Sequence, residues 1–234
     1  MQVLAIVHQR DAGPGVFATA IAERGDELGV WLPPEGAAPP ADPLGYDAVL
    51  VLGGAVHPDQ GDDHGWLGEE RELLKRLLEN GTPLLGLCLG GQLVAAAAGA
   101  TPRRAARPEI GWHRVELSAE GAEDPLLAPL APGFEAFQWH SYEFPLPPGG
   151  VPLAAGEVCL QACRIGAAAW ALQFHPEVSA ADALTWIDDY RSDEDAVRID
   201  LDPHALRAET EAKIEAFNQL GRDLCHRWLD VARP

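Results

Sequence analysis

The chain has 234 residues, of which 36 are acidic and 17 are basic, and its formal net charge is −19 at pH 7. This length fits one substantial core, and the negative charge argues against general nucleic-acid binding, which needs a basic surface. No apolar stretch approaches the roughly 20 residues that span a bilayer, and the N-terminal MQVLAIVHQR lacks the features of a signal peptide. We therefore expect a cytoplasmic protein with neither a membrane nor a nucleic-acid partner.

The first half of the chain alternates strand-like and helix-like segments. Apolar runs of the length of buried strands occur at residues 3–8, 30–32 and 46–54. Apolar residues at helical spacing occur between them, at residues 16–27 and 66–79. This alternation indicates an α/β fold in which an open, mostly parallel sheet is flanked by helices.

A strand-to-helix turn within residues 83–100 carries one thiol at its centre. Gly86 and Gly90 flank Cys88 in the pattern G-x-C-x-G, the cysteine form of a nucleophile elbow. Small neighbours permit the strained turn that pushes the side chain into a pocket, and the helix N-terminus behind it favours a reactive thiolate. Ligands of parallel sheets bind beyond the carboxyl ends of the strands, where Gly53-Gly54 also falls. Cys88 is therefore a candidate nucleophile in a crevice.

The region from residue 111 to residue 171 has a different character. It contains short strand-like runs and turns, which predict antiparallel strands at the edge of the sheet. Cys159 and Cys163 lie in this region without the C-x-x-C spacing of a zinc or redox motif. We expect both to be small buried side chains, with no disulfide and no zinc site.

The C-terminal part of the chain is predicted to be helical. Residues 179–182, with Ser first and Asp last, fit a capping box, and Asp202-Pro203 fits the start of a further helix. Residues 191–202 form an acidic connector between them. We divide the chain into a main domain, 1–190, and a helical extension packed on it, 191–234. The apolar stripe of the extension is expected to cover the core, with partner binding as the alternative; it comprises Leu206, Ile214, Phe217, Leu220, Leu224 and Trp228.

A cysteine nucleophile needs a base, and the segment 169–179 supplies one. An apolar strand ends at His175, and Glu177 follows across Pro176, which stiffens the turn. The imidazole can take the thiol proton and return a proton to the leaving group, while the carboxylate orients the imidazole. Cys88, His175 and Glu177 are therefore the expected catalytic residues.

These two motifs together resemble those of the class I glutamine amidotransferases, and in particular the freestanding glutaminase part of GMP synthase. The family's G-x-C-x-G-x-Q elbow is matched by Gly86, Cys88, Gly90 and Gln92, and its F-H-P-E motif by residues 174–177. The resemblance covers roughly residues 45–180. It implies a flavodoxin-like sheet and a Cys-His-Glu catalytic triad.

The resemblance also implies roles for residues around the elbow. The backbone N–H groups of Gly54 and Leu89 are expected to form the oxyanion hole. The expected substrate-binding residues are Gly53, Gln92, His140, Ser141 and Tyr142. Tyr142 stands where many relatives have Asp, so Glu143 is a candidate substitute for recognising the substrate amino group.

The implied reaction is hydrolysis of the γ-glutamyl amide of glutamine through a cysteine thioester, which releases ammonia and glutamate. It requires no metal or organic cofactor, and the ammonia could pass to a separate synthase. One alternative is a freestanding hydrolase of γ-glutamyl peptides or conjugates. Two further alternatives are a non-catalytic binding module on the same fold and another cysteine hydrolase, such as an intracellular peptidase.

A second cluster of possible metal ligands lies in the glycine-rich loop HPDQGDDHG. Its imidazoles and carboxylates have no recognised ligand spacing, so a solvated loop is the preferred interpretation and a divalent-metal site the alternative. The cluster comprises His57, Asp59, Asp62, Asp63 and His64.

Overall fold

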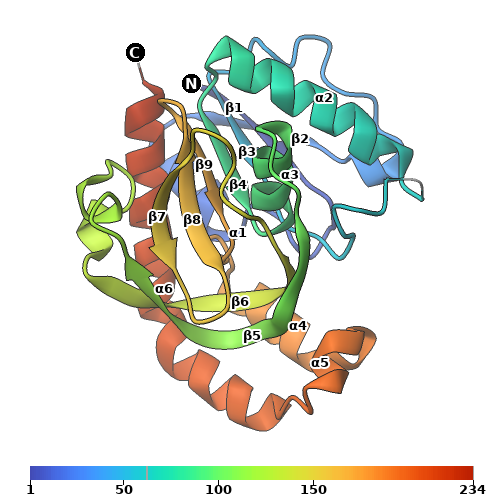
Figure 1. The fold of residues 1–234 in the computed structure, drawn as a ribbon, viewed down its shortest axis with the longest axis vertical. Coiled ribbons are helices and arrows are strands. Elements are labelled where there is room, and N and C mark those ends of the chain that lie inside the picture. The colour runs from blue at the N-terminus through green and yellow to red at the C-terminus, as the bar shows by residue number, and fades with distance from the viewer. Residues whose placement is uncertain (62, 234) are drawn as a thin grey trace.

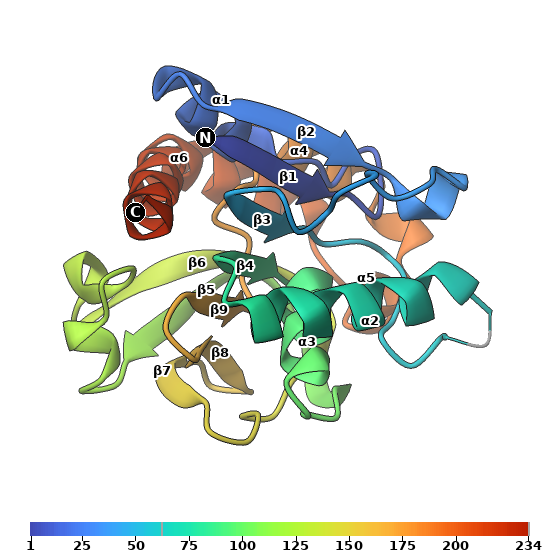
Figure 2. The same cartoon turned by 90° about the horizontal axis from the view of Figure 1, so that it is seen from above.

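One mixed sheet organises the computed structural model, which describes residues 1–61 and 63–233. Its strand order is β2-β1-β3-β4-β9-β8-β7-β5-β6, and helices cover both faces of its parallel part (Figures 1 and 2). The predicted α/β class, with a parallel core and antiparallel strands toward one edge, is confirmed.

The parallel part consists of five strands whose neighbours all run in the same direction. They are β1 (Gln2–Ile6), β2 (Glu27–Trp31), β3 (Ala48–Val51), β4 (Leu84–Leu87) and β9 (Ala169–Leu172). Every residue of β3, β4 and β9 is buried, as expected for strands covered by helices on both faces. The strand predicted at 46–54 is shorter than expected, and Gly53-Gly54 therefore lies in the loop beyond its carboxyl end.

The antiparallel part fills the region predicted for it. It consists of β5 (Arg103–Leu117), β6 (Gly133–Glu143), β7 (Val151–Ala155) and β8 (Leu160–Ile165). The long β5–β6 pair carries the chain from the edge of the sheet back toward the carboxyl ends of the parallel strands, as Figure 1 shows. This path brings the end of β6 next to Cys88.

The helices form two layers with different strand residues beneath them. One apolar cluster joins α1 (Gly15–Glu23), α4 (Ala180–Asp188) and α6 (Pro203–Ala232) to one face of the sheet. A second joins α2 (Gly65–Asn80) and α3 (Leu89–Ala97) to the opposite face. The strand β1 shows the alternation, because Val3 and Ala5 belong to the first cluster and Leu4 and Ile6 to the second. None of the helices among the described residues is long and apolar enough to cross a membrane.

The C-terminal helix α6 covers the core. Asp202 caps it by accepting hydrogen bonds from the His204 and Ala205 amides, with Pro203 in the first turn, and Ser179 and Asp182 form the predicted capping box of α4. Five members of its apolar stripe are buried and Leu220 is half-buried, which confirms the expectation that the stripe covers the core; the five are Leu206, Ile214, Phe217, Leu224 and Trp228.

The acidic segment 191–202 is more structured than a connector. It contains the end of a 3-10 turn, Tyr190–Ser192, and a short helix, α5 (Glu194–Arg198). Asp193 caps α5 by accepting from the Asp195 and Ala196 amides. The sequence prediction was wrong here because the carboxylates were read as solvated charges, although one of them serves as a helix cap. Other short 3-10 turns occur at Pro33–Glu35, Gly121–Glu123 and Ala128–Leu130.

Candidate active site

Cys88 lies at the turn between β4 and α3, in a conformation that non-glycine residues rarely adopt. Its φ is 52°, in the left-handed half of backbone space. The neighbouring glycines explain how the turn fits, since a Cβ on Gly86 would lie 2.5 Å from the Gly90 carbonyl oxygen and one on Gly90 would lie 2.0 Å from the Val51 oxygen. Any side chain at either position would displace the elbow, so the G-x-C-x-G spacing is a packing requirement as well as a chemical one.

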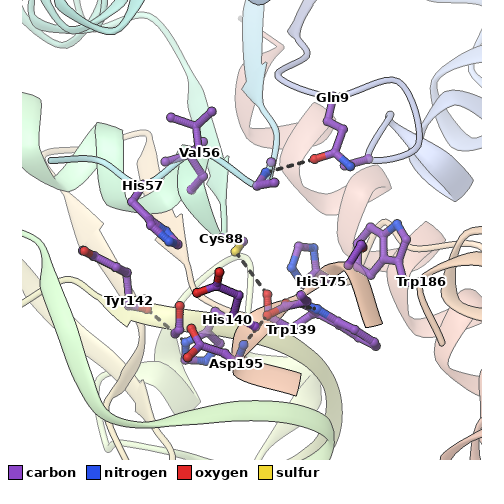
Figure 3. A pocket seen from close by; sticks show the side chains of 18 of the residues that line it. Gln9, Val56, His57, Cys88, Trp139, His140, Tyr142, His175, Trp186 and Asp195 are labelled. Carbon is purple, nitrogen blue, oxygen red and sulfur yellow. Dashed lines mark hydrogen bonds between the residues drawn. The ribbon is translucent and has the colours of Figure 1, made fainter. Parts of the chain in front are cut away.

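The thiol opens into a cavity of about 460 Å³ at the carboxyl ends of the parallel strands. Figure 3 shows Cys88 near the middle of this cavity, with side chains converging from several loops. Residues predicted for the site that line it are Gly54, Cys88, Leu89, Gln92, His140, Ser141, Tyr142 and His175. Gly53 and Glu177 lie behind that surface.

His175 and Glu177 form a buried pair beside the cavity. The His175 Nδ1 atom lies 2.8 Å from the Glu177 Oε1 atom, and both residues are at most 2% exposed. Burial opposes protonation of the imidazole, but the charges of Glu177 and of the Cys88 thiolate outweigh it and raise the pKa of His175 to about 10. The imidazole therefore holds its proton at neutral pH when the thiolate is present.

The sulfur and the imidazole approach each other across Gly53. A Cβ on Gly53 would lie 3.0 Å from His175 Cε1 and 3.6 Å from Cys88 Cβ, so the two side chains flank the same point. The Cys88 Sγ contact is the Trp139 carbonyl oxygen at 3.8 Å. Within the described residues the buried His175 Nε2 atom has no hydrogen-bond partner. This nitrogen is therefore available to a group that enters the cavity.

The turn that carries His175 and Glu177 is held between two helices. A Cβ on Gly15, at the start of α1, would lie 2.0 Å from the Glu177 carbonyl oxygen. A Cβ on Gly221, in the middle of α6, would lie 2.0 Å from the Pro176 carbonyl oxygen. Both glycines therefore allow a helix to press against the turn, a support that the sequence motif did not reveal.

The expected oxyanion donors, Gly54 and Leu89, border the thiol. Leu89 is the first residue of α3, whose leading N–H groups have no partner inside the helix. Among the hydrogen bonds of residues 1–61 and 63–233, neither amide is used as a donor. The next amide, of Ala55, donates to Gln9 Oε1 at 3.0 Å, which fixes the loop from the other side. Both predicted amides are thus free to receive an oxygen.

A buried ion pair that sequence reasoning missed stands behind the same loop. His8 Nδ1 lies 2.8 Å from the Leu52 carbonyl oxygen, and its Nε2 lies 2.9 Å from Glu70 Oε2. Both side chains are fully buried, and Glu70 raises the pKa of His8 although desolvation acts against it. A Cβ on Gly54 would lie 2.7 Å from His8 Cβ, so this pair supports the oxyanion loop directly.

Gln92 and His140 both brace the end of β6. Gln92 Nε2 donates to the Tyr142 carbonyl oxygen at 3.0 Å, and His140 Nδ1 donates to the same oxygen at 3.0 Å. The other imidazole nitrogen of His140 faces Glu109 Oε2 at 3.2 Å, and this contact lowers the pKa of the Glu109 carboxyl despite its burial. The geometry gives both residues a means of fixing the backbone on which Ser141 and Tyr142 lie.

Tyr142 closes one side of the cavity with residues of the loop that follows β3. Its hydroxyl donates to Asp59 Oδ2 at 3.0 Å, and its ring stacks on His57 with centroids 4.3 Å apart. Glu143, by contrast, binds Arg103 at 2.8 Å and does not line the cavity. The suggestion that Glu143 replaces the usual carboxylate is therefore not supported, because successive strand residues point to opposite faces. Asp59 is the carboxylate that the structure brings to Tyr142.

The loop considered as a metal site contributes to this wall instead. His57 and Asp59 both contact Tyr142, and Asp62 lies outside the described residues. A different group of potential ligands lies close together, formed by Glu109, His140 and Cys159.

Hydrogen bonds connect this second group. The Cys159 thiol donates to Glu109 Oε2 at 3.5 Å, and Gln161 Nε2 donates to the same oxygen at 2.9 Å. Burial and the Glu109 charge raise the pKa of the Cys159 thiol. The expectation of an ordinary apolar environment was thus wrong for Cys159, whereas Cys163 is buried in an apolar cluster as predicted.

The wall on the far side of His175 is aromatic and acidic. Trp186, on α4, meets the His175 ring edge-on at 5.0 Å, and Trp139 meets Trp186 edge-on at 6.1 Å. Several carboxylates from the start of the chain and from the α4–α5 segment complete this wall: Asp11, Asp189, Asp193, Glu194 and Asp195. These carboxylates were not predicted as site residues, because they lie in segments with no motif.

Comparison with known proteins places this geometry among relatives. The family model described as glutamine amidotransferase class-I matches residues 17–186. A γ-glutamyl-L-1-hydroxyisopropylamide hydrolase from Pseudomonas sp is 33% identical over 150 residues, covering 60% of this chain and 50% of that protein. The glutamine-hydrolyzing subunit of GMP synthase from Sulfolobus acidocaldarius is 36% identical over 99 residues, covering 41% of this chain and 51% of that protein. The matched region thus spans about half the length of both relatives.

A solved structure resembles the whole fold. The crystal structure of a glutamine amidotransferase from Thermotoga maritima superposes with a TM-score of 0.88 at 28% sequence identity, covering 98% of each chain. The similarity therefore extends over the C-terminal helical segment as well as over the matched family region.

Proposed function

This chain belongs to the class I glutamine amidotransferase family, and from that premise we propose that it hydrolyses a γ-glutamyl amide, with free glutamine as the default substrate. Amide hydrolysis by this family is the activity that its relatives support. The observation that carries the proposal is the shared cavity of Cys88 and His175, with Glu177 hydrogen-bonded behind the imidazole.

The first half of the reaction acylates Cys88. His175 takes the thiol proton, and the thiolate attacks the side-chain amide carbon, so that a C–S bond forms and the carbonyl oxygen becomes negative. The Gly54 and Leu89 amides stabilise that oxygen, each by about 3 kcal/mol. His175 then returns the proton to the nitrogen, the C–N bond breaks, and ammonia leaves a γ-glutamyl thioester.

The second half releases glutamate. Water gives a proton to His175 and attacks the thioester carbon, after which the C–S bond breaks and the thiolate is restored. Glu177 holds the imidazole in the orientation that both steps need and stabilises its cation. Residues Gln92, His140, Ser141 and Tyr142 form the wall that we propose to receive the glutamate head group.

Replacing the nucleophile tests this proposal. Cys88→Ala should lower release of glutamate and ammonia from glutamine to the level of a protein-free control. Cys225→Ala is the matched control, because Cys225 is buried in α6 with its sulfur 3.9 Å from the Phe17 oxygen and away from the cavity. Retention of full hydrolysis of glutamine and of γ-glutamyl amides by folded Cys88→Ala would refute the assignment.

A second candidate is a hydrolase of larger γ-glutamyl amides that works without a partner. The Tyr142–Asp59 contact, in place of the usual single carboxylate, favours it, as does the similarity to the Pseudomonas hydrolase. Transfer of ammonia to a separate synthase remains the proposal that follows from the likeness to the glutamine-hydrolyzing part of GMP synthase. A glutaminase rate that increases on addition of a purified synthase would favour the transfer function, and γ-glutamyl amide turnover by the isolated chain would favour the hydrolase.

The helical extension, residues 191–234, is proposed to act as part of the same domain. The α6 helix packs on α1 and α4, and its Gly221 borders the turn that carries the base. Catalysis in this view requires the whole chain.

A further inference from the structure

We infer that the preferred substrate of this site is a γ-glutamyl amide whose leaving amine carries a second, positively charged group. The inference rests on the proposed function and concerns the part of the substrate beyond the scissile bond. The side chains that carry it line the cavity beyond His175, away from the wall proposed for the glutamate head group.

The leaving amine must lie on the side of His175, since that imidazole protonates it. The buried Nε2 of His175 is without a partner among the described residues and faces the cavity. On this side the cavity is walled by Trp186, 5.0 Å from the His175 ring, and then by Trp139. Figure 3 shows Trp186 beyond His175 and Tyr142 on the opposite side of Cys88. The head group and the amine therefore occupy different ends of the cavity.

The charge of the lining is predominantly negative. Five carboxylates and two guanidinium groups line the cavity, and both guanidinium groups, of Arg104 and Arg198, pair with the same buried carboxylate, Asp195. Among the residues that the structure describes, the side chains of Asp11, Asp189 and Glu194 make no ion pair. These charges are therefore available to a cation in the cavity, where converging carboxylates reinforce one another's field.

The indole N–H groups are already used, so the rings can offer only apolar and π surface. Trp186 Nε1 donates to the Asp11 carbonyl oxygen at 2.9 Å, and Trp139 Nε1 donates to Asp193 Oδ2 at 2.8 Å. These bonds fix both rings and also place Asp11 and Asp193 against them. Aromatic faces beside carboxylates suit an alkylammonium group, whose methylenes pack on the rings while its charge meets the carboxylates.

The chemistry of this reaction is the one proposed above with a substituted nitrogen. The thiolate of Cys88 forms a C–S bond with the γ-carbon as the C–N bond breaks, and the proton from His175 goes to the departing nitrogen. Water then cleaves the thioester to give glutamate and the free diamine. The ammonium group at the far end of the amine takes no part in the bond changes and serves only for recognition.

Three amides of matched length test the inference. They are γ-glutamyl-4-aminobutylamide, which is cationic, γ-glutamyl-pentylamide, which is its neutral isostere, and the γ-glutamyl conjugate of 4-aminobutyric acid, which is anionic. We expect kcat/KM to favour the cationic over the neutral amide by about tenfold at low ionic strength, and the ratio to fall as salt is added. The anionic conjugate should be the poorest of the three.

Variants of the wall locate the effect. Asp11→Asn combined with Asp189→Asn should reduce the cationic-to-neutral ratio of kcat/KM at least threefold, because both substitutions remove charge while keeping shape. Asp42→Asn is the matched control, since Asp42 is exposed in the proline-rich loop and does not line the cavity. Binding of the same amides to the Cys88→Ala protein, measured by calorimetry, should show the same order of affinities without turnover.

The outcomes separate this inference from the proposed function. A ratio of one or less, or a ratio that the double variant leaves unchanged, would overturn the inference while hydrolysis that depends on Cys88 keeps the function. Absence of turnover for glutamine and for all three amides would overturn both. Equal binding of the cationic and neutral amides to Cys88→Ala would likewise count against a charge-selective wall.

Discussion

His175 is the residue at which burial and charge oppose each other most directly. Desolvation disfavours its cation, yet Glu177 at 2.8 Å and the nearby thiolate of Cys88 raise its pKa to about 10. Because this pKa exceeds the ordinary value of 6.5, the pair contributes stability below about pH 6.5 that is lost as pH rises through about 10. The same cation is the acid that the proposed leaving step needs.

Glu177→Gln should therefore change the pH profile as well as the rate. Without the carboxylate the pKa of His175 falls, so the alkaline limb of kcat/KM, expected near pH 10 in the wild type, moves to lower pH. The rate at neutral pH should fall by roughly 10²- to 10⁴-fold, as when an orienting carboxylate is removed from a triad. A pH–rate profile of both proteins, with Glu177→Asp as the conservative variant, checks this. An unmoved alkaline limb would contradict the role given to Glu177.

Single residues also show the limits of motif reading. The sequence correctly directed attention to Tyr142 as a departure from the family pattern. It could not identify Asp59 as the carboxylate beside it, because the two are 83 positions apart and meet only after β3 and β6 converge. Glu143 was the nearest carboxylate in sequence, but it points to the other side of the strand and binds Arg103.

At the scale of elements, the turn that holds His175 depends on α1 and α6. Gly15 and Gly221 let the two helices approach the carbonyl oxygens of Glu177 and Pro176. Glycine inside a helix costs about 1 kcal/mol relative to alanine, so a reason for its presence in α6 is needed. Close contact with the Pro176 oxygen supplies that reason.

Gly221→Ala should reduce both stability and kcat despite the better helix propensity of alanine. The new Cβ would lie 2.0 Å from the Pro176 oxygen, so the helix or the turn must shift, which displaces His175. Gly68→Ala in α2 is the matched control, because nothing lies within 4 Å of its new Cβ. That control should instead stabilise the protein by about 0.5–1 kcal/mol. Chemical denaturation and glutaminase assays of both variants distinguish the two effects.

Patterns of elements were predictable wherever the signal was local. The alternation of apolar runs gave the parallel sheet, and the Ser179–Asp182 box and the Asp202-Pro203 start appear at the ends of α4 and α6 as expected. The α5 segment was missed because its organisation depends on partners far away in the chain, such as Arg104, which pairs with Asp195. The His8–Glu70 pair was missed for the same reason, since nothing near either residue marks it.

For the whole molecule, the two helical layers and the sheet are expected to unfold together. The buried residues of α6, α1 and the sheet form one continuous apolar cluster. A cluster of this kind leaves no plane along which residues 191–234 could detach without exposing apolar surface. The site, which draws on both layers, should disappear in the same transition.

Trp228→Ala tests this cooperativity. Trp228 is fully buried in α6, so its truncation should cost about 3–5 kcal/mol of the free energy of unfolding. Helical circular dichroism and glutaminase activity should then be lost at the same, lower temperature. Loss of the helical signal in two separate steps, with activity retained after the first, would show that the extension folds apart from the rest.

The contact of Gly221 with the Pro176 turn has a consequence for protein engineering. The matched family region ends at residue 186, yet a backbone that the proposed base relies on is shaped by a helix that begins at residue 203. A chimera that joined the matched region to a foreign C-terminal helix would retain all three motif residues and still lose their alignment. Recombination between homologues should therefore keep residues 174–177 and α6 from the same parent.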